Sequence, residues 1–321
     1  MSHYGYFPGC SLEHSAAAYA ESIQFVASTL DMRLETIDDW NCCGATEYIA
    51  LNKLAAYSLV ARTLALAERQ LRAHDQPQHL IAPCSACYLN LRKADRMMQD
   101  DRLLSNYTNE ALAAGHLHYD PGTIHIRHLI EVLIHDIGLS EVAQHVSNPL
   151  VGLRVAPYYG CLLSRPHYQD ELDKAEYPTE LDDLLRQLGA EVPDFPGKTW
   201  CCGGHMTQIS VEVAYELLRE ILQAATDADA DVMATACPMC QLNLDAYQAQ
   251  VNHHFGTHFQ MPIVYFTQLV ALAFGAEPNS IGLGREIISA RPALEHIGHP
   301  IESAAPARHH TEELPMPQAR R

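Results

Sequence analysis

Ten cysteines fall into two groups that share one order of motifs. Each group has a single cysteine, then an adjacent pair, then a C-x-x-C motif, and no cysteine is left over. The spacing is C-x31-CC-x40-C-x2-C in the first half and C-x39-CC-x34-C-x2-C in the second. Two matching sets of five thiols predict two sites for metal binding or redox chemistry. The first set is Cys10, Cys42, Cys43, Cys84 and Cys87, and the second is Cys161, Cys201, Cys202, Cys237 and Cys240.

Five thiolates per set leave several kinds of site open. Buried free cysteine behaves as a small apolar side chain, but chance would not produce two matching frames. Zinc would use four thiolates in a closed tetrahedral site and leave the fifth unused. A cubane iron–sulfur cluster also ordinarily takes four. The surplus thiolate therefore favours an opened or extended cluster in which one cysteine bridges two irons, or else a free redox thiol.

Residues beside the cysteines favour binding of an anionic group. Cys84 and Cys237 begin predicted helices, where the dipole and free N–H groups lower the pKa of a thiol. Pro238 suits a first helical turn. Gly44 and Gly203 directly follow the adjacent pairs, where glycine would let the backbone approach a bulky cluster and donate N–H bonds to its sulfides. These two glycines are therefore candidate cofactor-binding residues.

The two sets belong to an internal duplication. "FPGCSLEHSA" at 7–16 aligns with "YYGCLLSRPH" at 158–167, and "IAPCSACYLNL" at 81–91 aligns with "ATACPMCQLNL" at 234–244. The offsets between matching cysteines are 151, 159 and 153 residues. Each repeat is therefore expected to be one structural unit, and loop insertions account for the differences.

Each repeat alternates strand and helix patterns, which predicts an α/β fold with a parallel sheet in each of two duplicated domains. Binding sites collect at the carboxyl ends of such strands, where the cysteines lie. The expected strands cover 3–7, 33–37 and 78–83 in the first repeat, and 153–158, 190–193 and 231–236 in the second. The expected helices cover 16–30, 52–73, 178–188 and 209–228, with a further helix opening at each C-x-x-C motif.

We predict a first domain over 1–150, with extra helices at 101–147, and a second domain over 151–280. From about residue 280 the periodicity weakens, and the last residues are rich in Pro and Ala. We therefore predict a flexible tail over 281–321.

Composition excludes some classes of partner. The chain of 321 residues has 21 basic and 39 acidic side chains and a net charge of -18, which would repel nucleic acid. No apolar run is long enough to span a bilayer. The N-terminus has no signal-peptide pattern, so we expect a cytoplasmic protein, in a compartment that disfavours disulfides.

The chain resembles the B subunit of heterodisulfide reductase and, more broadly, the CCG-domain proteins. The resemblance covers roughly residues 3–275 and rests on motifs in family order. These are "YFPGCSLE", "DWNCCGA", "APCSACY", "YYGCLL", "CCGG", "ACPMCQLNLD" and "VYFTQLVALAFG". The stretch "CCGATEYIALNKLAAYSLVARTLALAE" favours the sulfur-oxidising branch of heterodisulfide reductase-like proteins.

The resemblance implies two noncubane 4Fe-4S clusters, one held by each set of five cysteines. The first repeat departs from the family in the 40 residues between Cys43 and Cys84, where the mid-thirties are usual. An insertion near "RAHDQPQ" would explain the difference without moving a ligand. Zinc remains the alternative, above all for the first site.

The resemblance also implies a function, as the catalytic iron–sulfur subunit of a multisubunit oxidoreductase that acts on sulfur groups. It would interconvert a disulfide and thiols between the two clusters, or oxidise a thiol or sulfane sulfur in reverse, on a small-molecule or protein-bound substrate. Departing thiolates need protons, and His205, His14 and His167 are candidate donors.

The chain has no glycine motif for a flavin and no ferredoxin cysteine run, so electrons must come from partners. The resemblance implies two of them, similar to the flavin-bearing A subunit of heterodisulfide reductase and to its C subunit, which carries cubane 4Fe-4S clusters. Two other functions stay open. One is the quinone-reactive subunit of a succinate or fumarate dehydrogenase, and the other is a zinc scaffold without catalysis.

Overall fold

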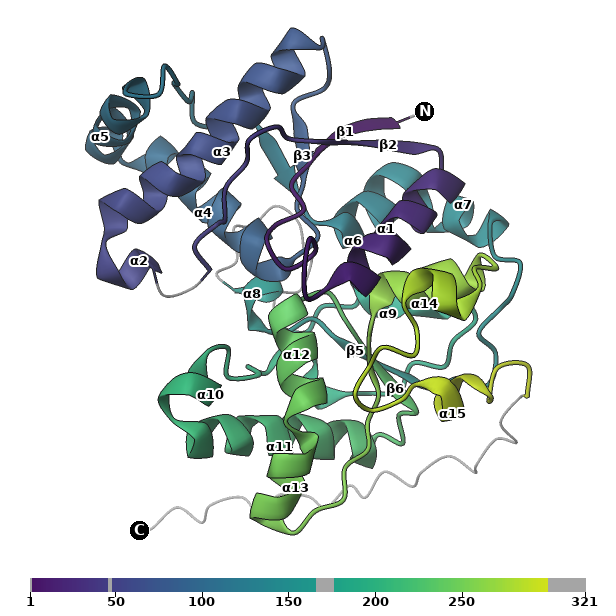
Figure 1. Cartoon of the computed structure of the whole chain (residues 1–321). Coiled ribbons are helices and arrows are strands. Elements are labelled where there is room, and N and C mark those ends of the chain that lie inside the picture. Colours follow the sequence, from purple (N-terminus) through teal and green to yellow (C-terminus); the bar gives the residue numbers. More distant parts are fainter. Residues whose placement is uncertain (1, 46–47, 166–175, 300–321) are drawn as a thin grey trace, which may run out of the picture.

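The computed structural model describes residues 2–45, 48–165 and 176–299. Two parallel sheets, one from each repeat, lie one above the other with helices around them (Figure 1). This confirms the predicted α/β class with a duplicated parallel-sheet core.

Among the described residues, the first sheet has four parallel strands in the order β2-β1-β3-β4. Its strands are β1 (Ser2–Tyr6), β2 (Met32–Thr36), β3 (His79–Ile81) and β4 (His125–Arg127). The central strand β1 pairs with both neighbours, and Tyr6 is in register with Thr36 and with Ile81. Leu80 and Ile81 are fully buried, as expected of a short apolar strand covered on both faces.

In the part of the chain that the structure describes, the second sheet has three parallel strands in the order β5-β6-β7. They are β5 (Val155–Tyr158), β6 (Val232–Thr235) and β7 (Ile263–Tyr265), and all their residues are buried. The strand predicted over 190–193 is reduced to a single bridge between Arg154 and Glu191. Pro193 follows closely and cannot donate a ladder hydrogen bond, which limits pairing there.

The helices cover the sheets and connect their strands. In the first repeat they are α1 (Ala17–Thr29), α2 (Tyr48–Leu51), α3 (Lys53–Ala73), α4 (Ser85–Asp100), α5 (Arg102–Ala113), α6 (Leu129–Glu131), a π-helical turn (Val132–Gly138) and α7 (Leu139–Gln144). In the second they are α8 (Cys161–Ser164), α9 (Glu180–Gln187), the 3-10 turn Pro196–Thr199, α10 (Met206–Ile209), α11 (Val211–Asp227), α12 (Pro238–Ala246), α13 (Gln248–Phe255), α14 (Phe266–Ala273), the 3-10 turn Pro278–Ile281 and α15 (Arg291–Leu294).

Helices α1 and α14 join the two repeats and lie side by side in Figure 1. Tyr19 stacks on Tyr265 with a centroid distance of 4.3 Å, and Ser22 Oγ lies 2.6 Å from Thr267 Oγ1. The buried apolar residues of both repeats form one continuous cluster. The repeats therefore share a core, and the division at residue 150 stays a prediction.

The segment predicted as a tail, 281–321, is described as far as residue 299. In this part Leu283 and Ala290 are buried, and the backbone N–H groups of Ile287 and Ile288 each donate to the Asp245 carboxylate at 2.9 Å. Residues 281–299 therefore pack on the second repeat and, through Arg285 with Glu21, on α1 of the first, while 300–321 lie outside the described residues. None of the described helices is long and apolar enough to cross a membrane.

Candidate functional site

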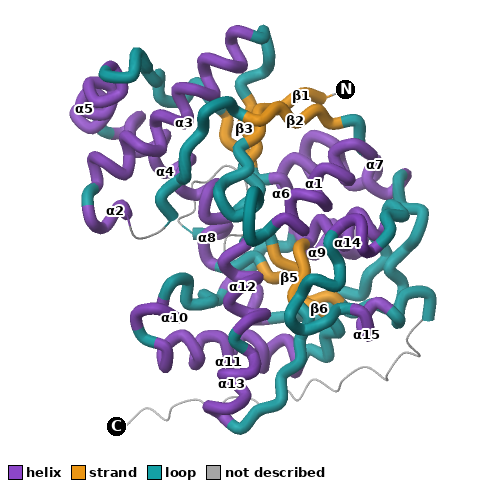
Figure 2. The backbone as a smooth tube through the Cα atoms, in the orientation of Figure 1, coloured by secondary structure: helices purple, strands orange, loops and turns teal. Residues whose placement is uncertain are grey.

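The cysteines lie where strands of the two sheets end. Strand β1 leads into Cys10 and strand β5 into Cys161, while β3 and β6 lead into Cys84 and Cys237. The last two are the N-cap residues of α4 and α12. Figure 2 shows one group of strands above the other, with loops and helix ends between them. The single cysteines and the C-x-x-C motifs therefore lie just beyond strands, while the adjacent pairs lie in loops, Cys42 after β2 and Cys201 after the 3-10 turn Pro196–Thr199.

The first set of thiols forms a connected group. Cys42 Sγ lies 3.8 Å from Cys10 Sγ, and Cys43 Sγ lies 3.3 Å from Cys87 Sγ. The thiols of Cys42 and Cys43 also hydrogen-bond, as do those of Cys84 and Cys87. Five cysteines from three separate segments of the first repeat therefore converge at one place.

The second set repeats this arrangement. Cys202 Sγ lies 3.4 Å from Cys240 Sγ, and the Cys240 thiol also hydrogen-bonds to Cys237. Cys161 and Cys201 form a second hydrogen-bonded pair, which the adjacent residue Cys202 connects to the others. The second repeat therefore also brings its five thiols together.

The two sets meet in the interior. The thiols of Cys84 and Cys237 hydrogen-bond to each other across the boundary between the repeats, and both residues are buried. Backbone contacts support this meeting point, because Ser85 N donates to Ala236 O at 3.4 Å. Tyr19 Oη donates to Pro83 O at 2.8 Å and also reaches Ala236 O at 3.4 Å.

Hydrogen bonds between thiols lower the pKa of one cysteine in each adjacent pair. In the first pair Cys42 donates to Cys43, which lowers the pKa of Cys43 and raises that of Cys42. In the second pair the thiol of Cys161 donates to Cys201, and the pKa of Cys201 falls to about 6. The pKa is therefore lowered at the second cysteine of the first pair and at the first cysteine of the second pair.

The same effect corrects a prediction at the two helix starts. The pKa of Cys237 is lowered by hydrogen bonds from Cys240 and Cys84, with help from backbone N–H groups of the first turn of α12. The pKa of Cys84 is raised instead, mainly because its thiol donates to Cys237. The prediction of a lowered pKa at Cys84 is wrong, because two thiols that share one hydrogen bond cannot both be the acceptor.

The predicted glycines both contact cysteine sulfur. Gly44 N donates to Cys42 Sγ and Gly203 N donates to Cys201 Sγ, each at 3.4 Å. Their φ angles are +78° and +86°, a region that glycine enters at little cost. A role toward a bound cluster stays a prediction.

Sequence reasoning missed a second pair of glycines, Gly9 and Gly160. Their φ angles are +74° and +68°. A Cβ atom would lie 2.9 Å from Cys87 Sγ at Gly9 and 3.2 Å from Cys240 Sγ at Gly160. The available signal was a glycine directly before the first cysteine of both repeats.

Two asparagines hold the loops of the adjacent pairs and were also missed. Asn90 Nδ2 donates to Cys43 O at 3.1 Å and also to Ala45 O. Asn243 Nδ2 donates to Cys202 O at 3.2 Å and to Gly204 O at 2.7 Å, and it lies 3.8 Å from Cys202 Sγ. The signal was the shared "LNL" that follows each C-x-x-C motif.

The candidate proton donors have different surroundings. His205 is half-buried and directly follows Gly204 in the loop of the second adjacent pair. His14 is exposed and lines a cavity of about 250 Å³ together with Tyr265 and Arg285. His167 lies outside the described residues. A role in proton transfer stays a prediction for all three.

The donor chemistry of both sets fits a thiolate-bound metal group. All ten cysteines are free thiols, and Gly9 and Gly160 leave room against a sulfur in each set. Among the described residues, no three His, Cys, Asp or Glu side chains are already arranged around a metal position. Because the thiols contact one another, they would have to turn apart to bind such a group.

Comparison with known proteins gives the same duplication. The model of a cysteine-rich domain, CCG, matches residues 4–92 and 155–245. A crystal structure of a hypothetical protein from Helicobacter pylori has a similar fold, with a TM-score of 0.68 at 12% sequence identity. The match covers 90% of this chain and 52% of that one, so this chain spans about half of its length.

Several curated relatives match nearly the full chain. An 8-methylmenaquinol:fumarate reductase membrane anchor subunit from Wolinella succinogenes is 32% identical over 89% of this chain and 97% of its own length. The B subunit of a ferredoxin/F(420)H(2)-dependent CoB-CoM heterodisulfide reductase from Methanosarcina acetivorans is 28% identical over 90% of this chain and 94% of its own. A protein from Archaeoglobus profundus, described as similar to the heterodisulfide reductase B subunit, is 27% identical over 88% and 93%.

Proposed function

Because the chain belongs to the CCG cysteine-rich family, whose members include heterodisulfide reductase B subunits, we propose that it is the catalytic iron–sulfur subunit of a heterodisulfide reductase-like complex. In this role it interconverts a disulfide and two thiols, or oxidises a thiol or sulfane sulfur in the reverse direction. The substrate is a small molecule or a protein-bound sulfur group.

The observation that carries this proposal is the meeting of the two sets at the boundary between the repeats, where Cys84 and Cys237 are both buried and Ser85 N, next to Cys84, donates to Ala236 O, next to Cys237. Reduction of a disulfide R–S–S–R′ breaks one S–S bond, consumes two electrons and two protons, and releases RSH and R′SH. A pair of sites that meet suits one substrate with two sulfur atoms. Two independent structural metal sites would need no such contact.

The residues proposed to hold the two clusters are the two sets of five cysteines. Noncubane 4Fe-4S clusters, when bound, would supply the electrons and iron positions that accept thiolate sulfur. The chain itself holds the adjacent pairs in place, because Asn90 and Asn243 fix the backbone carbonyls of their loops. Gly44 and Gly203 direct a backbone N–H at one sulfur of each pair.

Burial of the cysteines defines the side from which a substrate would approach. Cys10, Cys42 and Cys201 are exposed and Cys161 is half-buried. The other six cysteines are buried, and Tyr19, Tyr265 and His128 pack beside the meeting point and exclude water from it. A substrate would therefore move from the exposed cysteines toward Cys84 and Cys237.

Protons and electrons must come from outside this interior. His205 is the candidate donor on the loop of the second adjacent pair, and His14 is the candidate at the surface. Electrons would come from a partner with cubane 4Fe-4S clusters and from a flavin subunit, in a complex located in the cytoplasm. The chain itself contributes the two sets of thiols.

The first experiment is the iron, acid-labile sulfide and zinc content of protein purified without oxygen. We expect about eight irons and eight sulfides per chain, because each proposed cluster contains four of each. The same protein should cleave a disulfide when it is given a reduced dye as electron donor. Zinc with no iron would exclude the redox function and leave a zinc scaffold without catalysis as the function.

The relative from Wolinella succinogenes supports a second candidate function, in which the chain serves a fumarate or succinate dehydrogenase and reacts with a quinone. One zinc with four irons per chain would favour it, because a single cluster would then be active. Assays of the complex with a quinone analogue and with a disulfide separate the two functions directly. Turnover of the quinone alone would replace the main proposal.

A further inference from the structure

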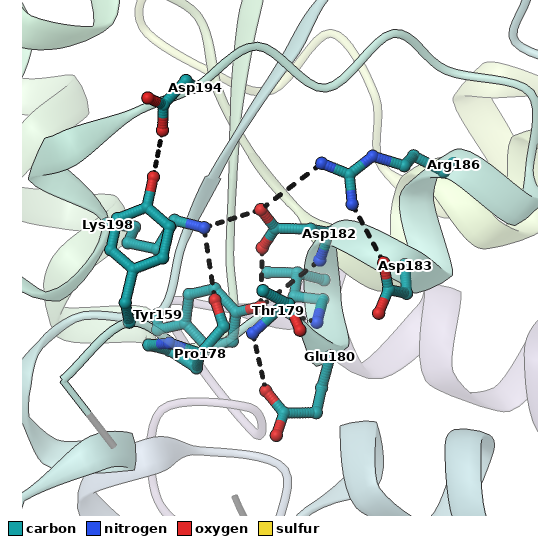
Figure 3. Close-up of polar contacts among 11 residues, drawn as sticks. Tyr159, Pro178, Thr179, Glu180, Asp182, Asp183, Arg186, Asp194 and Lys198 are labelled. Atoms are coloured by element: carbon teal, nitrogen blue, oxygen red, sulfur yellow. Dashed lines mark hydrogen bonds and ion pairs between the residues drawn. The ribbon is translucent and has the colours of Figure 1, made fainter. Parts of the chain in front are cut away.

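A fully buried lysine lies three residues before the second adjacent pair of cysteines. Lys198 belongs to the 3-10 turn Pro196–Thr199, and only 1% of its surface is exposed. Its Nζ donates to Asp182 Oδ1 at 2.6 Å and to Pro178 O at 3.2 Å, as Figure 3 shows. Lysine is almost never buried unless it is paired, so this residue needs an explanation.

The lysine belongs to a closed ring of contacts among three residues. Asp182 Oδ2 accepts a hydrogen bond from Tyr159 Oη at 2.7 Å, and Tyr159 N donates to Lys198 O at 2.9 Å. Tyr159 Oη in turn accepts from the backbone N–H of Leu181 at 2.7 Å. The start of α9, the end of β5 and the 3-10 turn are therefore tied together.

Two of the tied segments carry cysteines of the second set. Tyr159 lies two residues before Cys161, and Gly160 N also donates to Lys198 O at 3.0 Å. On the other side, Lys198 leads through Trp200 directly into Cys201 and Cys202. The ring therefore sets the distance between the single cysteine and the adjacent pair.

The surroundings of the ammonium group exclude a chemical role for it. Its Nζ lies 4.1 Å from the centroid of the Tyr177 ring and 5.8 Å from that of Tyr159, so aromatic rings cover it. It is paired with Asp182, of which 3% is exposed. A sealed, ion-paired amine reaches no substrate, but in a low dielectric its contacts are strong and directional.

The matching position of the first repeat is built differently. Asp39 stands three residues before Cys42, and its carboxylate pairs with the Arg62 guanidinium, which also donates to Asp39 O at 2.6 Å and to Asn41 Oδ1 at 3.1 Å. Both side chains are accessible to solvent, with 75% of Asp39 and 34% of Arg62 exposed. An exposed ion pair of this kind contributes little to local rigidity.

We propose that Lys198 is a positioning residue of the second cysteine site, which holds the Cys201–Cys202 loop against Cys161 through Asp182 and Tyr159. The first site has the exposed Asp39 pair at the matching position and is therefore the more mobile of the two. This inference rests on the proposed function for the identity of the bound cluster. The position of the thiols can be tested without any metal.

The test uses the full chain, reduced and free of metal, and follows alkylation of individual cysteines by iodoacetamide with mass spectrometry. Cys202 and Cys43 are the matched probes, since both are buried second members of an adjacent pair. In Lys198→Met, we expect Cys202 to react about tenfold faster or more, because its loop opens locally. Cys43 should keep its rate within about twofold, since a local opening leaves the first repeat unchanged.

Arg62→Met is the matched comparison in the first repeat. Because the contacts that it removes are accessible to solvent, it should raise the Cys43 rate much less than Lys198→Met raises the Cys202 rate, and it should leave Cys202 unchanged. Tyr159→Phe is a milder second variant, which removes one hydroxyl of the ring and keeps the backbone bond to Lys198 O. It should also increase the alkylation rate of Cys202, by less than Lys198→Met does. If Lys198→Met unfolds the whole chain, the alkylation rate of Cys43 also rises. The rates of Cys202 and Cys43 in Tyr159→Phe then test the positioning role.

Unchanged Cys202 reactivity in a folded variant would overturn the proposal. A second readout is the iron content and electron paramagnetic resonance spectrum after reconstitution, where Lys198→Met should lose the signal of one site and keep the other. If wild-type protein binds zinc in place of iron, the proposed function fails while the labelling result stands. If the clusters form but Cys202 is unaffected, the positioning role fails and the function stands.

Discussion

The two cysteine sites share their spacing and their immediate contacts, but different residues support them from behind. Asn90 and Asn243 make equivalent bonds, and so do Gly44 and Gly203. Behind these contacts, the second site has the buried Lys198, whereas the first has Asp39 at the surface. The duplication therefore keeps the residues that contact sulfur and changes those that hold the loops.

A second difference lies at the helices that follow the last strand of each sheet. His128 caps α6 in the first repeat, and its backbone N–H donates to Glu131 Oε2 at 3.2 Å. In the second repeat Tyr265 occupies the cap of α14, and its backbone N–H donates to Gln268 Oε1 at 2.9 Å. The His128 ring of the first cap titrates in the acid range, whereas the Tyr265 side chain of the second does not. A fall in pH should therefore destabilise the first repeat more than the second.

The largest expected effect tests whether the two sites work as a unit. Cys43→Ser and Cys202→Ser each remove one thiol from a different set, and each should reduce disulfide cleavage on the order of a thousandfold, because residues that act together are not additive. Reconstituted protein with a reduced dye and a disulfide provides the assay. Full activity in Cys43→Ser would restrict the chemistry to the second site.

The next effect compares the two ion pairs through the free energy of unfolding. Lys198→Met removes the buried partner of the Asp182 carboxylate and leaves the exposed Arg186 guanidinium at 4.0 Å as its remaining ion-pair partner, so it should cost about 3 kcal/mol, at the lower end of the cost of breaking a buried pair. Arg62→Met removes an exposed pair and should cost about 0.2–1 kcal/mol. Urea denaturation of metal-free protein gives both values. Combining Lys198→Met with Asp182→Asn should recover part of the loss, and similar costs for the two single variants would contradict the comparison.

The cap difference predicts a dependence of stability on acid. Burial lowers the pKa of His128 to about 4, so the folded state keeps this ring neutral while the unfolded chain protonates it. Stability is therefore complete above the unfolded pKa of about 6.5 and is lost as the pH falls toward 4, by roughly 3 kcal/mol.

His128→Asn keeps a residue suited to an N-cap and removes this titration, so the comparison of the two proteins isolates it from the raised pKa of neighbouring Glu131. Denaturation curves at pH 7 and pH 4 measure the effect. The wild type should lose more stability than the variant over this range. An equal loss in both proteins would assign the acid sensitivity to other groups.

The smallest effect concerns the glycines before the first cysteines. Gly9→Ala and Gly160→Ala should each cost about 1–2 kcal/mol for the positive φ alone. Gly9→Ala should cost more, because its Cβ would lie 2.9 Å from a sulfur against 3.2 Å in Gly160→Ala. Gly256→Ala is the control, since Gly256 has φ +69° with no neighbouring atom within 4 Å. Equal losses of unfolding free energy in all three variants would exclude the sulfur contact as a cause of the destabilisation.

Local pattern was sufficient to predict much of the fold. The strand-and-helix alternation predicted β1, β5 and the long helices α3 and α11 close to their observed bounds. Strands β4 and β7 were missed, since three buried residues within longer apolar stretches leave no period of their own. The strand predicted at 190–193 is only a single bridge at Glu191, because Pro193 has no N–H group to donate to a neighbouring strand.

The ten cysteines and their grouping came from the sequence because spacing and residue type are local properties that duplication repeats. Only the tertiary structure decided that the two sets meet at Cys84 and Cys237, and which thiol of that pair is the acceptor. Lys198 carried no signal, because a lysine in a polar loop looks like any exposed lysine until Asp182 and Tyr159 close around it. Contacts between distant segments, such as Tyr19 with Ala236 across 217 residues, depend on how the whole chain packs. No local spacing records them.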